Sequence, residues 1–442
     1  MEIKKEINFN QITLLNLLIA CIPLSIIVGN LFINVNIFLI IIFGIYKFKT
    51  ELFIIEKNLL NSCLIAFFLY LIFVTFLTAT SGIDSERIIK SILFLRYLFL
   101  FIVVAKLIEK NELNISYIFY SGAFFSFILG LDMLSQYIFD VGLAGNKRLN
   151  ANKISGFFGD EYIAGGYIKN FSFFLILFLP FIKYNLSRFQ ISSYLIVTTF
   201  YSFIIILISG NRMPLLLFLL SITIFALIEK KLRNTFLSCI IVFLVTFGFF
   251  YSFNAKVKQN FHGYYYYSKE IVINLKSIFL GSNFKQIIRG YETPEEIESY
   301  QEIIAKNPNK VIRSAHLKIF NSGVKVWKQN KIFGSGIKSF RYNCLELEDK
   351  SCSTHPHNYY IEILAETGLV GLILLSVVFL IILRRFYSAF INKELIFRQK
   401  IIIIPSFLIF FSEIFPLRST GSFFTTSNAV IFFLMLAIVA GS

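Results

Sequence analysis

Charged residues are scarce in this chain of 442 residues: Asp, Glu, Lys and Arg make up 15%, whereas hydrophobic residues make up 56% and the mean hydropathy is +0.72. A water-soluble domain of this length would have to expose much of that apolar surface to water. The few charges gather in short clusters between long apolar runs, and a transmembrane helix needs about 20 apolar residues. The composition therefore excludes a soluble globular protein and indicates a bundle of membrane-spanning helices.

The amino-terminal segment lacks the small-residue cleavage site of a secretory signal peptide. Lys4 and Lys5 precede an apolar run from residue 12 to 28, which is long for a signal peptide. We therefore expect an uncleaved first helix. Internal repeats are also absent from the sequence.

The apolar runs predict an all-α polytopic membrane protein with about twelve transmembrane helices. We divide it into an N-terminal transmembrane bundle of about nine helices (1–253), a large periplasmic loop that contains helices (254–356), and about three C-terminal transmembrane helices (357–442). The apolar segments lie near 12–30, 31–46, 60–79, 88–108, 116–139, 162–183, 191–208, 213–229, 235–253, 358–383, 400–417 and 423–440.

Positive charges gather in alternate loops, which orients the chain. Lys and Arg accumulate on the cytoplasmic side of membrane proteins, so the net charge of +16 needs no nucleic-acid partner. We predict a multi-pass protein of the bacterial inner membrane with both termini in the cytoplasm and residues 254–356 in the periplasm. The positive residues assigned to the inside are Lys4, Lys5, Lys47, Lys49, Lys57, Lys106, Lys110, Lys183, Arg188, Lys230, Lys231, Arg233, Arg384, Arg385, Lys393, Arg398 and Lys400.

The 254–356 loop is too long for a simple linker. Thr293 and Pro294, followed by two glutamates, predict the start of a helix that runs to about Lys306. Ile312, His316, Ile319, Phe320 and Trp327 recur at helical spacing, so an amphipathic helix should lie on the bundle there. The loop has an excess of positive charge, which attracts phosphate or anionic head groups.

Only five cysteines are present, and two of them lie in this loop. Cys344 and Cys352 have seven residues between them, and an oxidising compartment would let them form a disulfide. A metal site is the alternative reading, but it is weakened by the lack of a second pair of thiols. The other three, Cys21, Cys63 and Cys239, lie in apolar segments, where we expect inert packing.

The segment from Thr354 to Gly371 carries the clearest functional pattern. His357 and Asn358 are followed by nine residues, Gly368, two residues and Gly371. This pattern resembles the histidine motif of the O-antigen ligase and O-antigen polymerase family of bacterial membrane glycosyltransferases. The resemblance implies that His357 is catalytic and that Asn358 and His355 contact substrate, although His355 has less support and is equally consistent with a structural role.

From the residues themselves, we expect His357 to cap the outer end of a transmembrane helix, facing water and lipid. A solvated cap is also the usual fate of an isolated histidine at a membrane interface. Gly368 and Gly371 would let that helix approach a neighbour closely.

A second block, Ser209-Gly210-Asn211-Arg212, lies between two apolar segments and resembles the family's Ser-x-x-Arg turn. The resemblance implies that Arg212 holds the lipid pyrophosphate, which suits a planar guanidinium that stays charged. The alternative is an arginine that merely extends to the interface.

A third block runs from Lys153 to Glu161 and resembles the family's Arg-x-x-Gly-x-Phe segment, with lysine in place of arginine. It implies a phosphate-binding cation at Lys153 or at the nearby Arg148. Asp160 and Glu161 would orient sugar hydroxyls or cap the next helix. The family likeness extends to Arg341, which we assign to substrate binding.

Arg96 and Asp132 lie inside apolar segments, where ionisable groups are costly and are usually paired or functional. We expect them to pair with each other or to line the lipid cavity.

The resemblance implies a metal-independent, inverting transfer of a glycan from undecaprenyl pyrophosphate. The acceptor hydroxyl must lose a proton, for which neutral His357 is the candidate base. Arg212 with Lys153 or Arg148 would stabilise the departing pyrophosphate. No acidic cluster typical of a magnesium site accompanies these blocks, so we expect neither metal nor other cofactor.

The acceptor is lipid A-core for a ligase or another lipid-linked glycan for a polymerase. We favour the ligase because the large loop directly precedes the His-Asn helix. The alternative from another class is a flippase or transporter of lipid-linked oligosaccharide, which would place polar groups near the middle of the bilayer.

Overall fold

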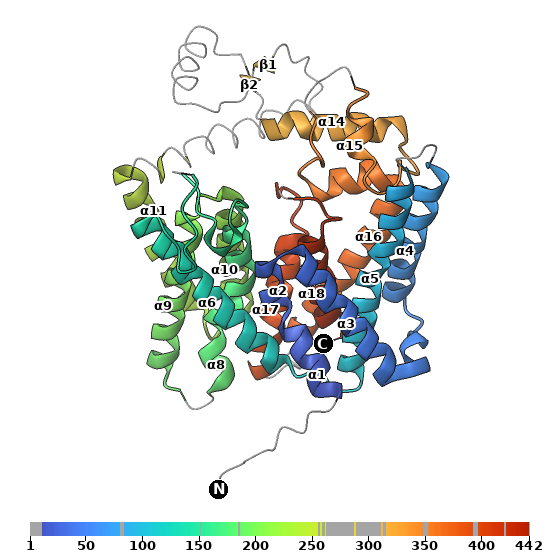
Figure 1. Cartoon of the computed structure of the whole chain (residues 1–442). Coiled ribbons are helices and arrows are strands. Elements are labelled where there is room, and N and C mark those ends of the chain that lie inside the picture. Colours follow the sequence, from blue (N-terminus) through green and yellow to red (C-terminus); the bar gives the residue numbers. More distant parts are fainter. Residues whose placement is uncertain are drawn as a thin grey trace.

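The computed structural model describes residues 11–79, 84–150, 152–183, 186–254, 257–258, 261, 287–288, 311–312, 315–347, 352–391, 397–419 and 421–441. These parts are helical apart from loops and one pair of two-residue parallel strands (Figure 1). The elements in chain order are α1 (Gln11–Ala20), α2 (Ile22–Val28), α3 (Asn30–Phe48), η1 (Lys49–Phe53), α4 (Leu59–Leu77), α5 (Asp84–Glu109), α6 (Ile115–Phe139), η2 (Gly156–Phe158), α7 (Ala164–Ile176), α8 (Phe178–Ile182), α9 (Arg188–Ile208), α10 (Arg212–Ile228), α11 (Arg233–Phe253), β1 (Ile287–Ile288), β2 (Val311–Ile312), α14 (Ala315–Gln329), α15 (Phe340–Asn343), α16 (Tyr359–Ile391), α17 (Phe397–Glu413) and α18 (Thr426–Gly441).

Eight helices in the described residues are long and apolar enough to cross a membrane, which makes this a multi-pass membrane protein. The pair α1 and α2, bent by 45° at their junction, gives a ninth span if it is counted as one. Shorter apolar helices lie at Arg212–Ile228, Ile403–Glu413 and Thr426–Gly441. Each predicted apolar segment thus corresponds to a helix or a bent pair, but the count of twelve crossings stays a prediction. The helix expected from Pro294 to Lys306 lies outside the described residues.

Two helices form the centre of the bundle. Every residue of α18 from Ala429 to Val439 is buried, and α7 packs on α6, α9, α10 and α17. A helix that is apolar on all sides is stable only when other helices surround it. Figure 1 shows α6 and α9–α11 on one side of the bundle and α3–α5 with α16 on the other, with α17 and α18 between them.

The amphipathic helix expected near residues 312–327 is confirmed as α14. It lies across one end of the bundle and packs on α16 (Figure 1). Its Val326 is fully buried, and its Gly323 faces Pro356 and Ile361. This helix therefore covers the segment that leads into α16.

A turn at residues 332–338, between α14 and α15, is inserted between α4, α5 and α16. The hydroxyl of Tyr70 donates to the Phe333 carbonyl at 2.7 Å, and that of Thr78 donates to the Ser335 carbonyl at 2.9 Å. On the other side, the Lys338 amide donates to the Glu366 carboxylate at 2.7 Å. The turn joins helices from both halves of the chain.

Glycine is required where this turn meets α16. Gly368 interrupts the helix with a φ of 64°, and a Cβ there would lie 2.3 Å from the Ile332 carbonyl oxygen. Gly334, with a φ of 75°, faces it backbone to backbone. The expectation of a close approach is confirmed for Gly368 but is wrong for Gly371, whose missing Cβ faces Thr367 of its own helix.

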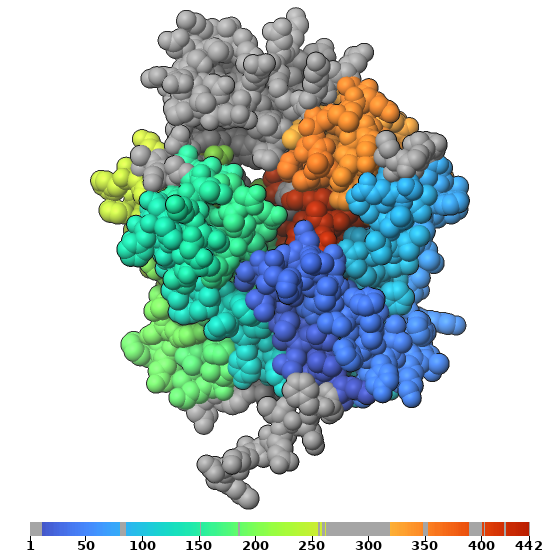
Figure 2. Space-filling model, in the orientation of Figure 1, coloured from blue at the N-terminus to red at the C-terminus, as the bar shows by residue number. Residues whose placement is uncertain are grey.

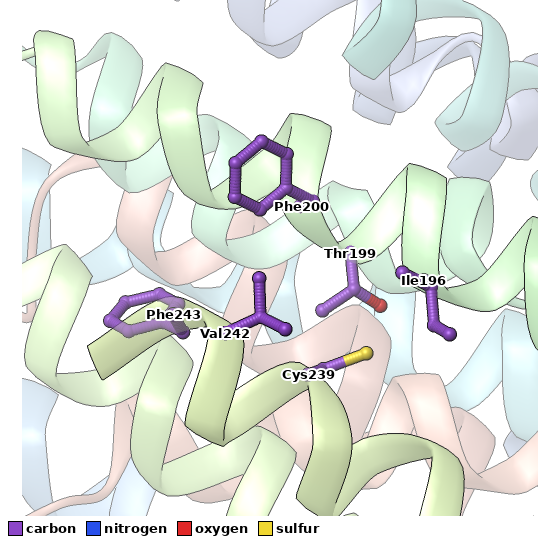
Figure 3. Close-up of a pocket in the computed structure, with 6 residues that line it drawn as sticks. All are labelled: Ile196, Thr199, Phe200, Cys239, Val242 and Phe243. Carbon is purple, nitrogen blue, oxygen red and sulfur yellow. The ribbon is translucent and has the colours of Figure 1, made fainter. Parts of the chain in front are cut away.

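A small pocket lies between α9 and α11 (Figure 3). Its lining, Ile196, Thr199, Phe200, Cys239, Val242 and Phe243, contains no charged side chain. It therefore offers nothing that would hold a phosphate.

Candidate active site

The His357 turn enters α16 in a left-handed backbone conformation, with a φ of 57° at His357. The rings of His355 and His357 meet edge to face, with centroids 4.2 Å apart, and Nδ1 of His355 lies 3.0 Å from the Thr354 hydroxyl. The two histidines are therefore in contact just before the N-terminal end of α16.

The helix cap is Asn358, so our expectation that His357 caps the helix is wrong. The Asn358 side-chain oxygen accepts from the amides of Tyr360 and Ile361 at 3.0 and 3.2 Å. Asparagine is among the best N-caps because its short side chain reaches these amides. The cap leaves the imidazole of His357 outside the helix.

The amide group of Asn358 ties this turn to the segment that follows α17. Its Nδ2 donates to the carbonyls of Pro416 and Arg418 at 2.7 and 3.2 Å, and the side chain is 6% exposed. Asn358 therefore fixes the His357 turn against Arg418.

A buried ion cluster lies beside this contact, and we call it the Glu413 cluster. Its members are Lys169, Asn170, Tyr359, Glu413 and Arg418. Lys169 and Asn170 donate to one Glu413 oxygen at 3.2 and 3.1 Å. Tyr359 donates to the other at 3.1 Å, and the Arg418 guanidinium pairs with that same oxygen. Glu413 is thus fully coordinated, as a buried carboxylate must be.

Arg418 is held in place by both charge and ring contacts. Its Cζ lies 5.2 Å from the centroid of the Tyr359 ring, and its side chain is 12% exposed. Burial lowers the pKa of Arg418, but the Glu413 carboxylate outweighs this and holds the pKa above its ordinary value. The group is therefore a permanent cation.

Sequence reasoning missed the Glu413 cluster, although a signal was present. Lys169 and Glu413 are ionisable residues inside apolar segments, the same feature that drew attention to Arg96 and Asp132. The expected Arg96–Asp132 pair is wrong: Arg96 donates to the Tyr97 hydroxyl at 2.9 Å, whereas Asp132 accepts from the Leu143 amide.

The first turns of α7 bring the three sequence blocks together. A Cβ at Gly165 would lie 2.4 Å from the Ser209 hydroxyl, and the Ile154 amide donates to the Ser209 carbonyl at 3.3 Å. Lys169, four residues after Gly165, reaches Glu413. At 1.5 Å per residue, Gly165 and Lys169 are about 6 Å apart along α7, so one turn of this helix contacts the Ser209 turn at one end and reaches the Glu413 cluster at the other.

Arg212 is the first residue of α10 and is exposed, as are Lys153 and Glu161. The Lys153 ammonium lies 5.5 Å from the centroid of the Tyr162 ring. The N-cap residue of α7 is Ile163, without a side-chain hydrogen bond, so the capping role considered for Asp160 and Glu161 is wrong.

Arg148, unlike these exposed groups, has a nearly buried side chain. Its guanidinium is 3.6 Å from the Asp140 carboxylate, donates from Nε to the Asn150 carbonyl at 2.9 Å, and is only 7% exposed. These contacts fix the loop between α6 and η2.

A second buried cluster lies further along the same side of α16, where Phe423 contacts both Tyr359 and Glu362, and was also missed. Glu362 accepts from the Ser422 hydroxyl and from the Phe423 amide at 2.5 and 2.6 Å. Glu366, one turn further, accepts from the Lys338 amide, and Arg341 of α15 lies within electrostatic reach of both carboxylates. The structure therefore places Arg341 with these glutamates.

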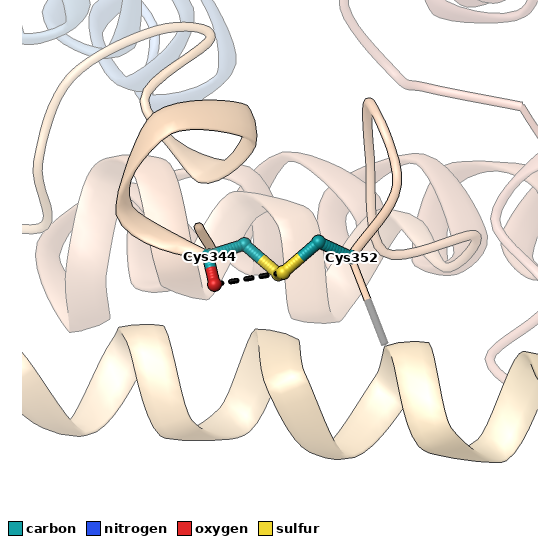
Figure 4. Close-up of a disulfide and its surroundings, with 2 residues drawn as sticks. All are labelled: Cys344 and Cys352. Carbon is teal, nitrogen blue, oxygen red and sulfur yellow. Dashed lines mark hydrogen bonds between the residues drawn. A yellow bond between two sulfur atoms is a disulfide. The ribbon is translucent and has the colours of Figure 1, made fainter. Parts of the chain in front are cut away.

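Cys344 and Cys352 form a disulfide, with Cα atoms 5.7 Å apart (Figure 4). Cys344 is fully buried and packs with Val326, Phe340 and Ala365. The bridge therefore joins α14, α15 and α16 just before the His357 turn.

Figure 2 shows a hollow at the centre of the face of the molecule that it presents. Red residues of the C-terminal part lie at the back of the hollow, between green, orange and blue segments from the rest of the chain. In the part of the chain that the structure describes, no group of three or more His, Cys, Asp and Glu side chains is placed to hold a metal ion.

A family model described as O-Antigen ligase matches residues 197–376. That range contains Arg212, Arg341, the disulfide and the complete His357 motif, in the arrangement described above. Over this stretch the chain is similar to the O-antigen ligase family. The family match does not extend to Arg148, Lys153, Glu161 or the Glu413–Arg418 segment. No curated protein matches the chain.

Proposed function

We propose that this protein acts as a member of the O-antigen ligase family and transfers a glycan from undecaprenyl pyrophosphate to lipid A-core on the periplasmic face of the inner membrane. The proposal is supported by a chain of contacts between the two turns. Gly165 of α7 packs on the Ser209 turn, Lys169 of α7 pairs with Glu413, and Asn358 bonds the Arg418 carbonyl. Phosphate-binding cations and a titratable imidazole are the groups that such a transfer needs.

His357 is the proposed general base. The attacking hydroxyl gains nucleophilicity as its proton moves to the neutral imidazole, and direct displacement of the pyrophosphate inverts the anomeric carbon. The contact with His355 limits the orientations that the His357 ring can adopt. Asn358 acts indirectly, since its side chain is used by the helix cap and the Arg418 segment.

The leaving pyrophosphate is proposed to be stabilised by Arg212 and Lys153. Both are exposed and lie on packed segments, since the Ile154 amide bonds the Ser209 carbonyl. Cations aimed at developing negative charge replace both protonation of the leaving group and a metal ion. We prefer Lys153 to Arg148 because Arg148 is nearly buried beside Asp140. Glu161 is proposed to orient sugar hydroxyls.

The periplasmic location of the proposed site is inferred from the positive charges that gather in alternate loops. Labelling of a cysteine introduced at residue 300 by a membrane-impermeant reagent in intact spheroplasts should succeed. Exclusion of the reagent until the membrane is permeabilised would place the site on the wrong side for this donor.

The acceptor is tested in a deletion strain by electrophoresis of its lipopolysaccharide. Complete loss of long chains from lipid A-core, with restoration by the wild-type gene, is the result expected of a ligase. A ladder reduced to one repeat would identify a polymerase. Accumulation of donor on the cytoplasmic face would instead indicate a transporter and overturn the proposal.

A further inference from the structure

We infer that Arg418 is a further phosphate-binding residue of this site and that Glu413 presents it to the substrate. This inference rests on the proposed function, because it takes the ligand to be the pyrophosphate of a polyprenyl-linked donor. Arg418 lies outside residues 197–376, which match the family model, and it is absent from every block that the sequence singled out.

Arg418 lies beside the start of α16, next to the turn that carries the proposed base. Its backbone carbonyl accepts from Asn358, and its guanidinium stacks on Tyr359, so it contacts the two residues that follow the proposed base. With 12% of its side chain exposed, Arg418 is accessible to a ligand that binds beside this turn.

The ion pair with Glu413 holds the Arg418 guanidinium in one orientation. Glu413 is already coordinated by Lys169, Asn170 and Tyr359, so it does not need an arginine for its own neutralisation. Its bond to one edge of the Arg418 guanidinium fixes the plane of that group. A fixed guanidinium plane is what bidentate phosphate binding requires.

The test compares two probes that differ only in the phosphates: a polyprenyl pyrophosphate without glycan and the corresponding polyprenyl alcohol. Binding to the purified full-length protein is measured in detergent. Wild-type protein should prefer the pyrophosphate. Arg418→Gln and Arg418→Lys should reduce that preference by about 10-fold or more, as expected for a lost charge-assisted bond of roughly 1.5–3 kcal/mol.

The matched control is Arg385→Gln at the other end of α16, where Arg385 donates to the Ala440 carbonyl at 2.8 Å. It should leave both affinities unchanged. If the Arg418 variants bind the pyrophosphate as the wild type does, or lose affinity for both probes equally, Arg418 is only structural and the inference is overturned. This binding assay does not depend on glycan transfer. Failure of the proposed function would be recognised separately, as wild-type protein that is inactive in a transfer assay.

A second measurement needs no variant. Phenylglyoxal should label Arg418 of the wild-type protein, and the pyrophosphate probe, but not the alcohol, should slow the labelling. Peptide mass spectrometry reports the site. Labelling that neither probe changes, or no labelling of Arg418 at all, would contradict the inference.

Discussion

At the scale of single residues, His357 and Asn358 have different roles at the start of α16. Asn358 uses its oxygen for the helix cap and its amide for the carbonyls of Pro416 and Arg418, so the adjacent imidazole is left outside the helix. A sequence pattern cannot tell which of the two residues caps the helix, since both lie at the same junction. The hydrogen bonds of Asn358 identify it as the cap.

Replacement of Asn358 by alanine should therefore cost both stability and activity. We expect a loss of about 1 kcal/mol from the cap alone, and slower transfer because the His357 turn loses its attachment to Arg418. Asn58→Ala is the control, because Asn58 caps α4 through the Asn61 amide at 2.9 Å. Thermal unfolding in detergent and glycan transfer are measured on both. Equal transfer by the two variants would show that the attachment has no role.

Arg212→Lys should preserve the charge at the start of α10 but lose the two-pronged contact with phosphate. We expect donor affinity to fall by roughly 10-fold, corresponding to about 1.5 kcal/mol for one bond to a charged group. The control is Arg233→Lys near the other end of α10, where Arg233 donates to the Ala226 carbonyl at 3.1 Å. A normal KM for the donor in Arg212→Lys would remove Arg212 from phosphate binding.

At the scale of elements, the helices could be predicted and most of the side-chain clusters could not. Long apolar runs specify helices locally, and the amphipathic pattern specified α14. The Glu413 cluster joins Lys169 to a residue 244 positions away, and the 332–338 turn joins Tyr70 to a residue 263 positions away. No local pattern in a single sequence indicates contacts between residues so far apart in the chain. The Ser209–Arg212 turn was found only because it resembles a family segment.

Gly368→Ala tests the contact between α16 and the 332–338 turn. A side chain at a φ of 64°, aimed at the Ile332 carbonyl, should destabilise the protein by about 1–3 kcal/mol and reduce folded yield. Gly248→Ala in α11 is the control, since nothing lies within 4 Å of its new Cβ. It should leave stability unchanged or raise it by up to about 1 kcal/mol. Similar melting temperatures for both variants would contradict this packing.

The disulfide should hold the segment that leads into the His357 turn without taking part in the chemistry. Replacement of Cys344 and Cys352 by serine should lower stability by roughly 2–4 kcal/mol and leave residual transfer. Mass spectrometry of non-reduced peptides should find the linked pair in freshly isolated protein. Two free thiols there would show that the bridge is absent in the cell.

At the scale of the whole molecule, the proposed site draws on both halves of the chain. The first half supplies Arg212, Lys153 and Lys169, and the second supplies His357, Glu413 and Arg418. The 332–338 turn and α7 connect the halves through buried polar contacts, Ile337 with Thr75 and Lys169 with Glu413, which are costly to leave unpaired in a membrane bundle. We propose that this shared site performs a metal-free glycan transfer with His357 as base.

The most direct measurement is glycan transfer by purified protein in liposomes, with lipid-linked donor and lipid A-core acceptor, in the presence of EDTA. Wild-type protein should be active, and His357→Ala should insert normally but transfer about 10²–10⁴-fold more slowly. Near-normal transfer by His357→Ala, or loss of wild-type transfer on chelation, would contradict the account.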